Sequence, residues 1–258
     1  MKIFRPFKNA LLLAAASALL FAAPKAQART YTNEKLSYQI VYHWGMIWKH
    51  AGNATLSIKR NGADYNAELV CWTRSWADKI YPLRDTLRVK MNKDFTPVVY
   101  EKATHEKGKY AYDVVRFTQN NGTTTGNCSR VRPKKATQNI TLSTTGKAYD
   151  MLSVFYMLRD LDFTKMTKNQ TVKTVVFSGK KKENLTLTYK GVETIKMRDG
   201  TKREAHRIGF KFTQDGGKKS SDNLDAWLAT GPSCIPLMLE GKLPIGEVKC
   251  YYGATSDK

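Results

Sequence analysis

Apolar and polar residues alternate along most of the chain, which is the period of strands with one buried face. Leu36, Tyr38, Ile40 and Tyr42 form the first such series. Asn61-Gly62 then predicts a tight hairpin turn, because both residues readily adopt a positive φ. The same pattern predicts further strands within residues 54–58, 65–71, 86–91, 97–103, 110–118, 128–132, 140–143, 172–177, 185–190, 192–197, 204–212, 224–229, 234–239 and 247–252.

Residues 147–160 depart from this pattern, because their apolar positions follow the helical period. Asp150 is expected to cap this helix, since a carboxylate there accepts free amides of the first turn. Arg159 would project from the middle of the apolar face, so it must pair with a carboxylate or reach solvent along the sheet surface. Two interpretations stay open for Arg159: a structural cation near the helix C-terminus, or an anion-binding residue in a pocket. The predicted apolar face carries Ala148, Met151, Leu152, Phe155 and Leu158.

One helix among many strands predicts a mainly β fold. We expect a large curved antiparallel sheet, half-barrel or sandwich-like, with one central amphipathic helix packed on it. No internal repeat, low-complexity linker or proline-rich boundary divides the sequence. Residues 29–258 are therefore expected to form a single β-rich domain.

The first 28 residues have the pattern of a cleaved signal peptide. Lys2, Arg5 and Lys8 precede a run of apolar and small residues over 10–23, and Ala26-Gln27-Ala28 fits the cleavage rule. The run is shorter than the roughly 20 residues that span a bilayer. We therefore expect a periplasmic or secreted protein that begins after cleavage near Ala28 and is not an integral membrane protein.

The charge balance favours anionic partners. The 258 residues carry a net charge of +21, and removal of residues 1–28, with four basic residues and no acid, leaves +17. In an exported protein, such partners would be lipid headgroups, lipopolysaccharide or acidic glycans, whereas nucleic acid is not expected. The basic residues are also dispersed, as on a surface that is kept solvated.

Four cysteines in an exported chain permit disulfide bonds. Cys234 and Cys250 flank a predicted hairpin turn at Gly241-Lys242, so we expect a bridge between them. The pairing of Cys71 and Cys128 stays open.

Four tryptophans close to predicted turns are the candidate binding residues: Trp44, Trp48, Trp72 and Trp76. Aromatic rings at the mouth of a sheet can stack on sugars or pack on acyl chains, while nearby cations hold a phosphate or carboxylate. The alternative is that these rings fill the core.

Motifs for other chemistry are missing. His43, His50, His105 and His206 show no metal-ligand spacing, and neither a Gly-x-Ser-x-Gly elbow nor a complete phosphate loop occurs. A carboxylate pair for glycoside hydrolysis could be drawn from Asp150, Glu193, Asp222 and Asp225, but the sequence does not bring any two of them together. We therefore expect no cofactor, no metal and no catalytic residue.

Several blocks of the sequence resemble the DUF3108 family of exported bacterial proteins. Residues 45–56 are similar to its Gly-x(6)-Gly-x-small-x-Leu block, and 149–159 to its Asp-x-Leu-Ser-x-x-Tyr-x-x-Arg helix. Gly191-Val192-Glu193 and Ala226-Trp227-Leu228 resemble two later blocks, although the acidic residue usual after Trp-Leu is replaced here by Ala229. The resemblance implies a β-rich envelope protein with no established reaction. It also suggests Glu193 as a structural residue and as the partner of Arg159.

Three functions follow in order of preference. The first is a non-catalytic binding or assembly protein of the periplasm. The second is a carrier of a lipid or other apolar anionic ligand, with the helix as a lid and Arg159 facing the headgroup. The third is an enzyme that acts on glycans.

Overall fold

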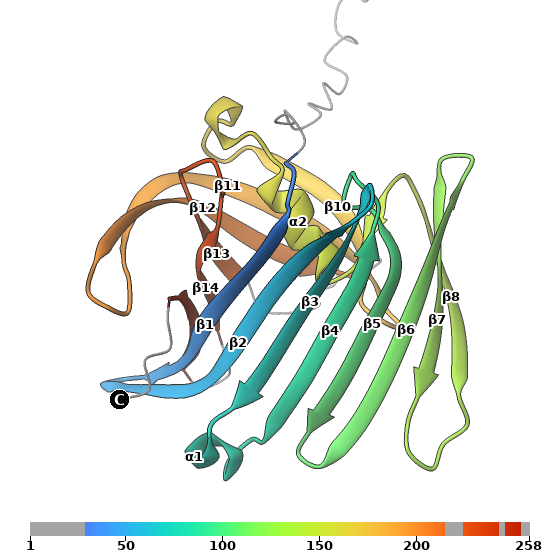
Figure 1. Ribbon diagram of the computed structural model, residues 1–258, viewed down its shortest axis with the longest axis horizontal. Helices are drawn as coiled ribbons and strands as arrows, with labels where there is room; N and C mark the ends of the chain where they lie inside the picture. Colours follow the sequence, from blue (N-terminus) through green and yellow to red (C-terminus); the bar gives the residue numbers. More distant parts are fainter. Residues whose placement is uncertain (1–28, 215–223, 243–245, 254–258) are drawn as a thin grey trace, which may run out of the picture.

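The computed structural model describes residues 29–214, 224–242 and 246–253, and these form one 15-stranded sheet. The predicted signal peptide, residues 1–28, lies outside the described residues. The sheet curls into a nearly closed, barrel-like shape, as the alternating pattern predicted (Figure 1). No helix among the described residues is long and apolar enough to cross a membrane.

The N-terminal half of the sheet is a meander in which each strand pairs antiparallel with the next. Tight turns with positive φ join several of these strands, including Gly62 in the predicted Asn61-Gly62 hairpin. The strands are β1 (Asn33–Trp44), β2 (Ile47–Asn61), β3 (Asp64–Thr73), β4 (Leu83–Met91), β5 (Pro97–Glu106), β6 (Lys109–Asn120), β7 (Thr123–Val131) and β8 (Gln138–Thr145). A short helix, α1 (Ser75–Asp78), joins β3 to β4.

The C-terminal half continues the sheet from its other edge. Its strands are β9 (Ala148–Tyr149), β10 (Thr171–Phe177), β11 (Lys182–Lys196), β12 (Lys202–Thr213), β13 (Leu224–Ala229), β14 (Pro236–Lys242) and β15 (Glu247–Tyr252). The helix α2 (Ser153–Arg159) and a 3₁₀ turn, η1 (Phe163–Lys165), lie between β9 and β10. Only β9 runs parallel to its neighbour, and β15 pairs antiparallel with β1 to join the two halves.

The two outermost strands, β8 and β9, are consecutive in the chain. Only Gly146 and Lys147 separate them, so the seam of the barrel closes where the chain passes from one half to the other. Across this seam, Phe177 of β10 stacks on Phe117 of β6, with ring centroids 5.6 Å apart. A Cβ on Gly126 of β7 would lie 2.6 Å from the Phe177 ring, so the close approach requires glycine there.

The helix α2 is buried on two sides by the curved sheet (Figure 1). Leu152 and Tyr156 pack into the core of the N-terminal half, beside Tyr31, Tyr65 and Phe95. Val154 and Leu158 pack into the core of the C-terminal half. The space beneath the helix is therefore filled largely by aromatic side chains of the first core.

The predicted helix over 147–160 was too long at its start. Ala148 and Tyr149 instead pair with Val175 and Val176 of β10, and α2 begins at Ser153. The prediction of a single apolar face was also wrong, because the helix meets a core on each side.

The predicted turn at Gly241-Lys242 also differs from the structure. Lys242 pairs with Glu247 and Leu239 with Cys250, so Gly241 and Lys242 belong to β14 and not to a turn. Cys234 precedes β14 and has no place opposite Cys250. The predicted bridge between them is not formed, and all four cysteines are free thiols.

Candidate functional site

Exposed apolar side chains gather at one rim of the sheet. The turns β1–β2, β3–β4, β5–β6 and β7–β8 all emerge there, because alternate turns of an antiparallel meander lie at the same edge (Figure 1). We call the following exposed residues the aromatic rim: Trp44, Met46, Ile47, Trp48, Ile80, Tyr81, Tyr110 and Val131. Among the described residues, Val192 is the only other large apolar side chain that is exposed to this degree.

The β1–β2 turn carries the most exposed part of the aromatic rim. Gly45 supplies the positive φ of the turn, and Met46 at its tip is 99 % exposed, while Trp44 is 54 % exposed. Trp48 stacks on His43 with ring centroids 3.8 Å apart, and Lys249 Nζ lies 5.3 Å from the Trp48 ring. Trp48 is thus held in place, whereas Trp44 and Met46 project outward.

The β3–β4 connection forms the next part of the rim. Trp76 of α1 donates from Nε1 to the His50 carbonyl at 2.7 Å, and Lys49 Nζ lies 4.1 Å from the Trp76 ring. This contact ties α1 to the β1–β2 hairpin. Ile80, 71 % exposed, and Tyr81 then extend the apolar surface toward the β5–β6 turn.

Trp72 does not join this group. It lies on β3 next to Cys71, which packs against the interior core, so strand alternation directs Trp72 to the outer face of the sheet. The sequence placed Trp44, Trp48 and Trp76 close to turns, and the structure brings these turns to one rim of the sheet. The prediction missed Met46, Ile47, Ile80 and Tyr81, although an apolar run at a turn, where polar residues are usual, was a visible signal.

Cations surround the apolar side chains of the rim. Six exposed lysines lie in these turns or in the strand residues next to them: Lys49, Lys79, Lys107, Lys109, Lys134 and Lys135. The carboxylates nearby have partners within the protein. Asp78 binds Arg84, Glu106 accepts a hydrogen bond from Tyr81, and Glu247 binds His43 and Lys249. The rim therefore presents apolar groups and positive charge together.

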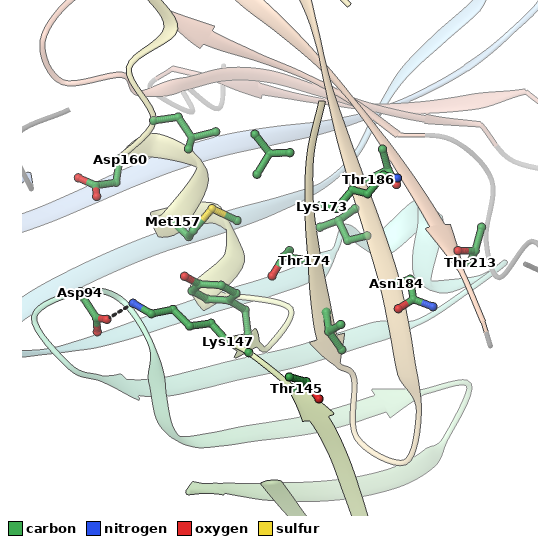
Figure 2. Close-up of a pocket in the computed structure, with 16 residues that line it drawn as sticks. Asp94, Thr145, Lys147, Met157, Asp160, Lys173, Thr174, Asn184, Thr186 and Thr213 are labelled. Carbon is green, nitrogen blue, oxygen red and sulfur yellow. Dashed lines mark hydrogen bonds and ion pairs between the residues drawn. The ribbon is translucent and has the colours of Figure 1, made fainter. Parts of the chain in front are cut away.

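A groove of about 680 Å³ lies at the seam of the barrel, and none of the residues that line it belongs to the rim (Figure 2). Met157 and Leu161 of the helical side face Val172 and Thr174 of β10 across it. Lys147 at its mouth pairs with Asp94, as Figure 2 shows. The polar part of the lining includes Thr145, Asn184, Thr186 and Thr213, and the charged Asp160 and Lys173.

Arg159 is fully buried and points away from this groove, toward β1. Its guanidinium donates to both carboxylate oxygens of Glu34, at 2.7 and 2.9 Å, and to the Ser233 carbonyl at 3.0 Å. The Tyr31 ring lies 4.8 Å from its central carbon. The predicted partner was Glu193, and the structure corrects this to Glu34.

Asp150 binds the first amides of α2, although the N-cap position is Leu152 and not Asp150 as the sequence predicted. Its Oδ1 accepts the amides of Leu152 and Ser153 at 2.7 and 2.9 Å, and the Ser153 hydroxyl accepts the Asp150 amide. Burial raises the pKa of Asp150 to about 6, although these hydrogen bonds oppose the shift. Together with Tyr156, whose hydroxyl donates to the Ser57 carbonyl, Asp150 and Arg159 anchor the helix in the barrel.

Glu193 and Asp225 meet at Arg207 on the C-terminal half. Arg207 lies 3.4 Å from Glu193 and 2.7 Å from Asp225, and Trp227 donates from its indole to Glu193. Burial alone would raise the pKa of Asp225, but the bonds from Arg207 and Lys190 outweigh it and lower that pKa. An arginine between the two carboxylates is typical of a structural network. Asp222, the fourth carboxylate considered for glycoside hydrolysis, lies outside the described residues.

The described part of the chain contains no group of three His, Cys, Asp or Glu residues that could hold a metal ion. His43 pairs with Glu247, His50 contacts Asn53, and His206 contacts Tyr189. These three histidines thus serve separate local networks.

Comparison with known proteins gives a family and a fold. The family model described as "Protein of unknown function (DUF3108)" matches residues 37–251. A solved beta-barrel-like protein of domain of unknown function DUF1849 from Brucella abortus has a TM-score of 0.61 to this chain at 11 % identity, and the match covers 88 % of this chain and 98 % of that one. At this identity the likeness concerns the fold. No curated protein matches the chain.

Proposed function

The chain belongs to the DUF3108 family, whose description assigns no activity, and we propose that it is a non-catalytic, exported envelope protein that docks on anionic membrane surfaces through the aromatic rim. The observation that carries the proposal is the concentration of exposed apolar side chains at the rim. Protein surfaces normally scatter such side chains singly, whereas a contiguous patch marks a site of interaction.

The chemistry of the rim suits a lipid headgroup region better than a protein partner. Tryptophan prefers the membrane interface, because its ring is apolar and its N–H is polar. Met46 and Ile47 at the hairpin tip can enter the upper acyl region, while the six lysines in or next to these turns contact anionic headgroups. Each lysine near such a surface contributes about 1 kcal/mol.

Vesicle co-sedimentation tests this proposal. The mature protein should bind vesicles of phosphatidylcholine with phosphatidylglycerol and should bind far less to phosphatidylcholine alone. Met46→Asp should weaken binding at least about tenfold, since burial of a methionine side chain contributes roughly 1.5–3 kcal/mol. Val192→Asp is the control, because Val192 is an exposed apolar residue on β11, which contributes to none of the turns of the rim.

A second experiment separates charge from apolar contact. Lys109→Glu combined with Lys134→Glu should weaken binding to the anionic vesicles, and Lys202→Glu, at an exposed position outside the rim, should not. Equal binding by the wild type, by Met46→Asp and by the double lysine variant would overturn the proposal.

The groove at the seam favours a second candidate, a carrier of a small apolar ligand with a polar end. Its volume lies in the range of ligand sites, and its lining combines apolar side chains with hydroxyl groups. Arg159 is bound to Glu34, so a headgroup in this groove would meet Lys147 or Lys173 instead. Native mass spectrometry of protein purified without detergent tests it. A bound lipid that is lost in Leu161→Trp supports the carrier, and its consistent absence counts against it.

A further inference from the structure

Arg29 contacts the end of α2 with both its backbone and its side chain. Its backbone nitrogen donates to Asp160 Oδ1 at 2.9 Å, and its guanidinium Nε donates to the Arg159 carbonyl. These contacts join residues that are 131 and 130 positions apart in the chain. Tyr31 fixes the segment between Arg29 and β1, because it is buried and packs edge-on against Tyr156 of α2.

We infer that the α-ammonium group released by cleavage between Ala28 and Arg29 binds the Asp160 carboxylate, so the fold contains an acceptor for its own processed N-terminus. This inference rests on the exported part of the proposed function. Hydrolysis of the Ala28–Arg29 peptide bond consumes one water. Ala28 leaves as a carboxylate, and the Arg29 nitrogen gains a proton to become an ammonium group.

Cleavage changes the charge of the donor in this contact. Before it, Arg29 offers Asp160 one neutral N–H. Afterwards the same nitrogen carries a positive charge and three donors, and charge-assisted bonds are roughly twice as strong as neutral ones. Asp160 is 9 % exposed, so water screens this pair less than it would screen a surface pair.

The surroundings of Asp160 suit a cation. Asp160 is the C-cap of α2, and the Arg29 guanidinium already binds a carbonyl at this end of the helix. The neighbouring Arg159 charge is neutralised by Glu34, so it does not repel the new ammonium group strongly.

The position of the contact agrees with the cleavage motif. Ala26-Gln27-Ala28 places the new terminus at Arg29, and Arg29 is the residue whose nitrogen meets Asp160. A terminus one residue earlier would convert this nitrogen back to an amide and shift the charge by about 3.8 Å.

A thermodynamic cycle tests the inference. The full-length gene is expressed for export, with and without a glycine inserted between Ala28 and Arg29, and with and without Asp160→Asn. Intact mass should show that the wild type begins at Arg29. The extra glycine should lower Tm by about 4 °C in the wild type and by less than about 1 °C in Asp160→Asn, because that variant has already lost the pair.

Asp162→Asn serves as the matched control, since Asp162 lies two residues further on and binds Lys165 and Thr164 locally. In Asp162→Asn the inserted glycine should lower Tm by as much as it does in the wild type. An equal loss of Tm with and without Asp160, no loss at all, or a mature chain that begins at another residue would overturn the inference. Vesicle binding, measured on the same samples, reports separately on the aromatic rim.

Discussion

Arg159 and Glu34 meet in two parallel hydrogen bonds of 2.7 and 2.9 Å, although 125 residues separate them in the chain. The guanidinium is fully buried at the end of α2, while the carboxylate belongs to β1. The pair therefore fixes the central helix to the strand that joins the two halves of the sheet. Its two-pronged geometry also sets the orientation of the helix, because a planar guanidinium matches a carboxylate in only a few arrangements.

Arg159→Ala should lower the free energy of unfolding by about 2–4 kcal/mol, because it leaves the partly buried Glu34 carboxylate without its cation. Urea denaturation measures this loss. Arg88→Ala is a suitable control, since Arg88 pairs with Glu68 at the surface and such pairs contribute about 0–1 kcal/mol. Equal losses in the two variants would contradict the structural role of the buried pair.

The Asp150 carboxyl should make stability fall as pH rises. Burial raises its pKa to about 6, against about 3.9 in the unfolded chain, so the folded state binds more protons between these values. The contribution of the protonated Asp150 carboxyl to stability is fully present below about pH 4 and is lost as the pH rises through about 6. Asp150→Asn keeps an oxygen for the cap and removes the titration.

The free energy of unfolding of Asp150→Asn, measured relative to that of the wild type, should therefore rise by on the order of 3 kcal/mol between pH 4 and pH 7. Urea midpoints at several pH values give this difference. A difference that stays constant with pH would show that Asp150 titrates normally.

Gly126→Ala should destabilise the seam of the barrel. The added methyl group would lie 2.6 Å from the Phe177 ring and 3.1 Å from Val115, and such overpacking costs about 1–3 kcal/mol. Gly231→Ala is the control, because a Cβ there meets nothing within 4 Å. Thermal unfolding should separate the two variants, and an equal Tm for both would show that the seam tolerates the methyl group.

The cysteines should behave as four shielded thiols. Burial raises the pKa of Cys71 and of Cys128 to about 11, so little reactive thiolate is present near neutral pH. Alkylation of the folded protein should be slow, and alkylation after denaturation without reductant should add four groups. A mass that corresponds to two groups would instead indicate one disulfide bond.

The sequence predicted the curved antiparallel sheet because each strand carries its own signal. The alternation of Leu36, Tyr38 and Ile40 depends only on which face is buried, and Asn61-Gly62 specifies its turn locally. That the Asp150 carboxylate accepts amides at the start of the helix could also be predicted, since the groups lie within three residues of each other, although the N-cap itself is Leu152. Local patterns are sufficient for these features.

Features that depend on distant residues could not be predicted in this way. The partner of Arg159 was misassigned because no local pattern connects it with Glu34. The disulfide between Cys234 and Cys250 was predicted wrongly, because the register of β14 and β15 differs from the one that a turn at Gly241-Lys242 would give. The aromatic rim was recognised only in part, since its turns come together only when the sheet forms.

The pairing of β1 with β15 also constrains how the molecule can assemble. Tyr38 and Tyr252 lie opposite each other, so the first strand finds one of its two neighbours only when the last strand is present. The meander β1–β8 can grow hairpin by hairpin, with β1 as an open edge that could recruit a foreign strand. An incompletely synthesised chain would carry this open edge until residues 247–252 are present, and closing it joins strands that lie about as far apart in the sequence as any in the sheet.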